Sequence, residues 1–134
     1  MIRSEYTTPP SLADLEAIAL EERDRLPEPV RAMVRDVPVM IEDFCDDEVA
    51  DELGLESPWD LSGLYSGTAE PDKGSGHVAH DHDRIFLYRR PLLDEWVETG
   101  VELRVLIRHV LIHEIGHHFG FSDADMAEIE RRSG

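Results

Sequence analysis

Five residues constrain this chain more than any others: His113-Glu114-Ile115-Gly116-His117. Side chains four residues apart lie on the same face of an α-helix. His113 and His117 can therefore direct two imidazoles at one metal ion, at about 2.0–2.1 Å each if the ion is zinc. Glu114 is rotated by about 100° from His113 on such a helix. This position suits a base that acts on bound water better than it suits a third ligand.

A third protein ligand is expected, because catalytic zinc sites commonly have three protein ligands and keep a fourth position for water. Gly120 can end the helix in a left-handed conformation and let the chain turn back. Asp123 can then return a carboxylate to the open side of the metal, and its spacing makes it our predicted third ligand. Asp125 is a rival. Glu128 and Glu130 could also supply a carboxylate from the last predicted helix, although the return distance looks short.

The whole chain fits one small acidic domain. Its 134 residues suit a single hydrophobic core. The formal net charge of −17 repels nucleic acid and anionic membranes, so we expect neither as a partner. Cys45 has no second cysteine to pair with and is predicted to be a small buried hydrophobe. No segment approaches the roughly 20 apolar residues of a membrane span, and the N-terminus lacks a signal-peptide core, so we expect a cytoplasmic protein.

The predicted elements are helices and short strands. Residues 1–10 are predicted to be a flexible N-terminal tail, which leaves residues 11–134 as the single domain. We predict helices over residues 12–26, 48–53, 92–98, 101–119 and 124–132, a helical turn at 30–34, and strands over 38–44, 61–67 and 84–88. The 101–119 segment carries the paired histidines and is apolar around most of its circumference. We therefore expect this helix to be largely buried.

These segments together resemble the minimal zincin-like metallopeptidases of bacteria, a family once catalogued only as a domain of unknown function. The resemblance runs from about residue 30 to residue 129. It is most specific over residues 110–123, Val-Leu-Ile-His-Glu-Ile-Gly-His-His-Phe-Gly-Phe-Ser-Asp, and includes strand segments 39–44, 63–67 and 84–89. It implies a zincin-like α+β fold, in which a small twisted mixed β-sheet packs against the active-site helix that carries H-E-x-x-H. It also implies one Zn²⁺ per chain, held by His113, His117 and Asp123, with Glu114 as the catalytic base.

The activity implied by the resemblance is zinc-dependent hydrolysis of a peptide or protein substrate. Zinc lowers the pKa of a bound water toward about 7. Glu114 is placed to take its proton and pass it to the leaving amine. The sequence departs from metzincins, which usually have histidine where Asp123 stands, and it leaves little chain for a second wall of the cleft. We therefore expect an open site, completed by a protein partner or a second copy. The alternative is a zincin-fold metal-binding or interaction module with little or no peptidase turnover.

The other histidines are less favoured as ligands of this metal. His109 is one helical turn before His113, but about 12 Å of helix rise separates it from His117. We therefore predict that His109 supports the site indirectly or lies in the core. His118 is predicted to point away from the metal. His77, His80 and His82 are predicted to form a solvated loop, with a second metal site or a flap over the cleft as the alternative.

Three other side chains have both a structural and a functional interpretation. Tyr65 and Tyr88 are candidate donors to an oxyanion. We favour core positions for both, because each lies in a predicted strand. Met126 follows Asp123 closely but lies inside a predicted helix, so we expect it in the core and not in a methionine-containing turn.

Overall fold

Three short strands form one mixed sheet. The computed structural model describes residues 8–67 and 82–134. The strands are β1 (Val39–Glu42), β2 (Gly63–Ser66) and β3 (Arg84–Tyr88), in the order β1-β3-β2. β1 runs parallel to β3, with Val39 opposite Ile85, and β2 runs antiparallel to β3, with Tyr65 opposite Ile85. β2 is therefore an edge strand of this sheet.

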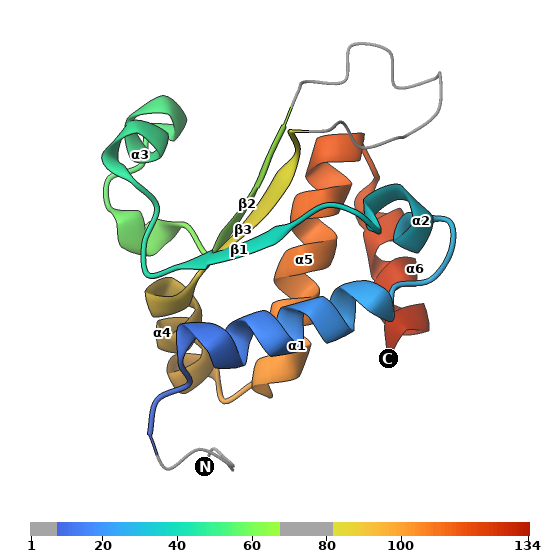
Figure 1. Cartoon of the computed structure of the whole chain (residues 1–134), viewed down its shortest axis with the longest axis horizontal. Helices are drawn as coiled ribbons and strands as arrows, with labels where there is room; N and C mark the ends of the chain where they lie inside the picture. The colour runs from blue at the N-terminus through green and yellow to red at the C-terminus, as the bar shows by residue number, and fades with distance from the viewer. Residues whose placement is uncertain (1–7, 68–81) are drawn as a thin grey trace.

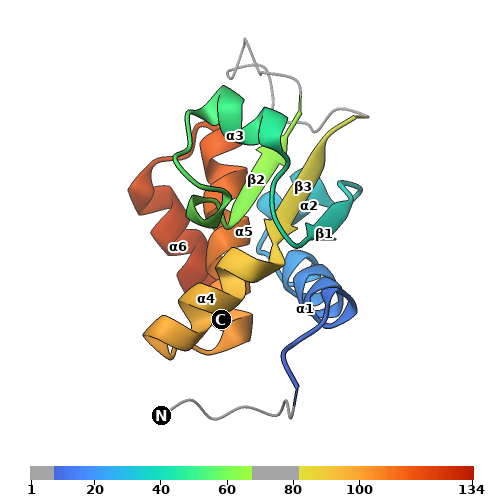
Figure 2. The same ribbon diagram turned by 90° about the vertical axis from the view of Figure 1, so that its left-hand side faces the viewer.

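Helices precede, interrupt and follow the strands. They are α1 (Leu12–Asp24), α2 (Val30–Val34), α3 (Asp47–Leu53), the 3₁₀ helix η1 (Pro58–Asp60), α4 (Arg89–Thr99), α5 (Leu103–Phe119) and α6 (Asp123–Ser133). Figure 1 shows α1 crossing α5, and Figures 1 and 2 both show α5 and α6 side by side. None of the helices in residues 8–67 and 82–134 is long and apolar enough to span a membrane.

One face of the sheet packs on α1 and α5. Successive side chains in a strand point to opposite faces. In β3, Ile85 and Leu87 are fully buried in a core shared with Leu15 of α1 and Ile107 of α5. Met40 of β1 has the opposite parity and is 41% exposed. The structure thus confirms the predicted α+β class, with a small mixed sheet on the helix that carries the histidines.

An ion-pair network joins α1 to α5. The Glu22 carboxylate is fully buried and accepts hydrogen bonds from Arg108 Nε at 2.7 Å and Arg104 Nη1 at 2.9 Å. Burial alone would raise the pKa of Glu22, but the two guanidinium groups outweigh it and hold the pKa below the ordinary value. The network therefore fixes α5 against a helix that is far away in sequence.

The helices lie where they were predicted, but several of their boundaries differ: α1 ends at Asp24 and α5 begins at Leu103. Gly54 ends α3 with φ 66°, and Gly100 ends α4 with φ 72°, as expected of glycines in the left-handed region. α4 begins at Arg89, directly after β3, and not at Leu92. Proline is tolerated throughout the first helical turn, because those amides have no intrahelical partner. Pro91 therefore lies in the first turn of α4.

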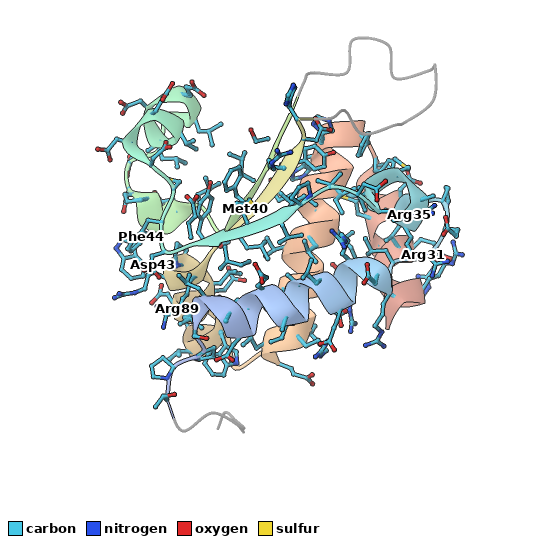
Figure 3. All side chains as sticks on the ribbon, viewed as in Figure 1. Arg31, Arg35, Met40, Asp43, Phe44 and Arg89 are labelled. Carbon is cyan, nitrogen blue, oxygen red and sulfur yellow. The ribbon has the colours of Figure 1, made fainter. Side chains whose placement is uncertain are left out.

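The boundary of the predicted tail also differs in part. Residues 1–7 lie outside the described residues. Pro10, which we placed in the flexible tail, is buried, and its carbonyl accepts a hydrogen bond from Arg89 Nε at 2.6 Å. Arg89 also donates to Asp43 at 3.2 Å, just beyond the end of β1 (Figure 3). The approach to α1 is thus attached to the start of α4.

Candidate metal centre

Three of the four histidines of α5, His109, His113 and His117, form a row along its exposed side. The opposite side is apolar and buried, with Ile107, Leu111 and Ile115 at 0–1% exposure. His109, His113 and His117 follow one another at intervals of four residues and lie on neighbouring turns. A largely buried helix can therefore present polar ligands, because the stripe of its surface that carries these histidines faces solvent.

A tight turn brings α6 back along α5. Gly120 has φ 78° and ends α5, and the Phe121 amide donates to the Gly116 carbonyl at 2.8 Å. Ser122 then caps α6 through a capping box with Asp125. Gly116 permits the close approach of the two helices, since a Cβ there would lie 2.7 Å from Met126 Cγ. Met126 is 1% exposed, which confirms it as a core residue.

His113 and His117 present the paired imidazoles that the motif predicts. Their ring centroids are 5.8 Å apart, with the ring planes at 87°. Burial lowers the pKa of His113, and the neighbouring His109 and His117 lower it further, against the opposing charges of Glu130 and Asp123. A lowered pKa keeps the imidazole neutral, which is the form that binds a metal. His113 is therefore prepared as a ligand by its surroundings.

Asp123 is the first residue of α6 and is exposed. Its charge opposes the lowering of the His113 pKa. The rival Asp125 is engaged elsewhere, because its carboxylate accepts a hydrogen bond from the Ser122 amide at 3.1 Å. Glu128 forms an ion pair with Arg131. Of these three carboxylates, Asp123 alone lies at the start of α6 without a capping or ion-pair partner among the contacts of the described residues.

Glu130 reaches α5 at a different point. Its Oε1 lies 3.9 Å from His113 Nε2 and also contacts His109 Nδ1. Ligand atoms of His109, His113 and Glu130 all lie within 4.8 Å of one another. His109 is 49% exposed, so a core position for it is wrong. The return distance of α6 is also longer than we expected, because α6 runs back beside α5 for several turns.

A spacing argument could have found this group. Asp123 and Glu130 are seven residues apart, or about two helical turns, so they share a face of α6. A short turn between two helices makes them antiparallel neighbours. The start of α6 then meets the end of α5, where His117 lies, and Glu130 meets the earlier turns, where His109 lies.

Glu114 lies on the side of α5 that faces β2. Burial raises the pKa of Glu114, and His117 and a hydrogen bond with the Tyr65 backbone oppose that rise. The Ser62 carbonyl accepts from the Tyr88 amide at 2.9 Å. Backbone groups alternate in direction along an antiparallel strand, so those of Tyr65 point away from β3. The free edge of β2 therefore orients Glu114.

Behind Glu114, a polar group fills the space between β2, β3 and α5. Tyr65 is buried, and its hydroxyl donates to Asp83 Oδ2 at 2.7 Å. The Tyr65 ring stacks on His118 at 3.9 Å, and His118 Nε2 lies 3.9 Å from the same Asp83 oxygen. The structure thus places His118 against β2 and confirms the core position of Tyr65. Its hydroxyl is committed to Asp83, which argues against a role as an oxyanion donor.

The other side chains considered in the sequence lie away from this centre or outside the described residues. Tyr88 is 2% exposed, so its predicted core position is confirmed, as is that of Cys45, which is 7% exposed. His82 is exposed. His77 and His80 lie outside the described residues, so the predicted loop stays a prediction.

The donors on α5 and α6 fit a zinc ion. Neutral imidazole and carboxylate oxygen are both ordinary zinc ligands, and a site with two histidines and one carboxylate leaves a position free for water. One group of described residues has this composition with ligand atoms within 4.8 Å of one another: it is His109, His113 and Glu130, and it does not include His117 or Asp123.

Comparison with known proteins identifies the family of the chain. The search of curated proteins gave no match. Residues 34–133 match the family model described as zincin-like metallopeptidase. The matched range contains the whole sheet, the histidine row of α5 and all of α6, and leaves out α1. The match covers well over half of the chain, which therefore belongs to the zincin-like metallopeptidase family.

Proposed function

We propose that this chain is a zinc-dependent peptidase that hydrolyses peptide bonds, with Glu114 as the general base. In this proposal His113, His117 and Asp123 hold the ion. The observation that supports it best is the placement of Glu114: its carboxylate is half-buried, near His117 and hydrogen-bonded to the edge strand β2. A metal site that only stabilises a fold has no need of such a base.

The chemistry follows from the position of Glu114. A zinc ion, when bound, supplies polarisation of the scissile carbonyl and makes water more acidic. Glu114 accepts the proton of the attacking water and carries it to the nitrogen of the leaving amine. A base works best when its pKa is near the working pH. Burial moves the pKa of Glu114 upward, in that direction.

The edge of β2 suits an extended peptide. Among the described residues no strand pairs with the side of β2 that faces away from β3. An extended segment can add to such an edge through main-chain hydrogen bonds. A peptide bound there would run past Glu114, because the Tyr65 backbone already meets that carboxylate. Main-chain recognition favours a peptide substrate over a small molecule.

Metal removal tests the proposal. The protein is stripped with a chelator, dialysed, and one portion is restored with one equivalent of zinc. Both portions are incubated with a mixed peptide library, and new termini are identified by mass spectrometry. We expect cleavage by the restored protein and none by the stripped protein. Equal cleavage in both portions would contradict the proposal, as would intact peptides after zinc binding has been verified.

The alternative function is a zincin-fold module that binds metal or a partner with little turnover. The exposure of His117 and Asp123 favours it, since an open site excludes water poorly. We propose that a protein partner or a second copy of the chain completes the cleft. Activity per chain should then rise with protein concentration or on addition of the partner. Tight zinc binding with no peptide cleavage at any protein concentration would favour the metal-binding or interaction module.

A further inference from the structure

We propose that His109, His113 and Glu130 form a second divalent-metal site, one helical turn before the His113–His117 pair. The sequence motif does not include His109 or Glu130. The structure nevertheless brings them together from two helices, with His113 between the two sites. The proposal concerns metal binding and does not depend on peptidase activity.

The three ligand atoms of the group lie close enough together to share one ion. Two donors of a tetrahedral zinc lie about 3.3 Å apart when each bond is about 2.0–2.1 Å. His113 Nε2 and Glu130 Oε1 are 3.9 Å apart, and all three ligand atoms lie within 4.8 Å of one another. His109 Nδ1 contacts Glu130 Oε1 directly. An ion bound by the group would replace this contact.

The accessibility of the three side chains also suits a metal site. The side chains of His109, His113 and Glu130 are 49%, 35% and 33% exposed. An ion can therefore enter from solvent without opening of the core. The ligands come from α5 and α6, whose close packing is fixed by Gly116 against Met126. The site thus lies on rigid elements.

The two sites exclude one another because they share His113. A neutral imidazole has one nitrogen free to bind, since the other carries the proton. An ion held by His109 and Glu130 therefore takes His113 away from His117. The two positions are displaced by four residues, or about 6 Å along the helix. Glu114 is electrostatically coupled to His117, so an ion in the upstream position would lie away from the base.

Cobalt(II) binding to the His117→Ala protein tests the proposal. This variant removes the second histidine of the motif and keeps the upstream group. Binding is followed by equilibrium dialysis and by the visible d–d absorption of cobalt, with no substrate present. We expect one cobalt per chain with tetrahedral-type absorption. His109→Ala in the same background should weaken binding by at least about tenfold, and so should Glu130→Gln.

The matched control is His82→Ala in the His117→Ala background, because His82 is exposed and distant in sequence. It should bind cobalt as tightly as His117→Ala alone. The proposal is overturned if His117→Ala binds no cobalt, or if adding His109→Ala leaves the affinity unchanged. Far-ultraviolet circular dichroism of each variant verifies folding, and Glu130→Gln provides an independent test should His109→Ala unfold. Failure here leaves the peptidase proposal intact, since that proposal concerns His117 and Glu114.

Discussion

At the scale of single residues, the central question is which carboxylate completes the histidine pair. Asp123 and Glu130 share a face of α6, but Asp123 is the first residue of α6, directly after the turn that follows α5, whereas Glu130 contacts His109. The two side chains therefore lie toward different ends of the histidine row. Substitution of each in turn separates their roles.

We predict that Asp123→Asn lowers kcat/KM of the zinc-saturated protein by about 10–100-fold, because a ligand that tunes and orients the ion is lost. Glu130→Gln should leave kcat/KM close to that of the wild type. Steady-state hydrolysis of one fluorogenic peptide measures both, and Asp36→Asn, exposed and outside the centre, is the control. The reverse ranking would make Glu130 the third ligand.

At the scale of secondary-structure elements, the site depends on how α5 is held between α1 and α6. On one side the buried carboxylate of Glu22 binds Arg104 and Arg108. On the other, Met126 packs against Gly116. Neither contact touches the proposed reaction centre, so each can be tested through stability.

Glu22→Gln should lower the free energy of unfolding at pH 7 by about 3 kcal/mol, because it removes the buried carboxylate charge that pairs with the partly buried Arg104 and Arg108. The folded-state pKa of Glu22 lies below its ordinary value of 4.5. The ionised network therefore stabilises the fold above that pH, and the stabilisation is lost as the pH falls through the folded-state pKa. Urea unfolding from pH 7 to pH 3 should show this loss in the wild type and a flatter profile in Glu22→Gln. Glu98→Gln serves as the exposed control, and a Glu22→Gln profile identical to that of the wild type would refute the role.

Gly116→Ala should destabilise the wild type by about 1 kcal/mol. Overpacking against Met126 costs about 1–3 kcal/mol, and the better helix propensity of alanine offsets about 0.8–1.0 kcal/mol. In a Met126→Ala background the clash is absent, so the same change should be neutral or stabilising. Chemical denaturation of the wild type, Gly116→Ala, Met126→Ala and the double variant gives the four free energies of unfolding of this double-mutant cycle. An equal effect of Gly116→Ala in both backgrounds would show that Met126 does not limit the approach of α6.

At the scale of the whole molecule, local signals in the sequence were sufficient for most of the fold. Strand Arg84–Tyr88 has the predicted bounds, and Gly54, Gly100 and Gly120 end helices as glycines in the left-handed region. These features depend on neighbouring residues alone. The H-E-x-x-H segment likewise places His113 and His117 by helix geometry, without knowledge of the rest of the chain.

Features that depend on the packing of distant elements could not be predicted in the same way. The burial of Glu22 requires α1 to lie against α5. The polar cluster of Tyr65, Asp83 and His118 unites three elements, and no spacing in the sequence indicates it. The choice between ligand sets thus needed the tertiary structure.

The most direct test of the account is the turnover of Glu114→Gln protein that holds a full equivalent of zinc. Zinc content is measured first, by elemental analysis, so that a change in turnover cannot come from lost metal. The account predicts unchanged zinc affinity and a fall in kcat of about 10²–10⁴-fold, with Glu98→Gln equal to the wild type. Fully zinc-loaded Glu114→Gln that turns over at the wild-type rate would contradict it.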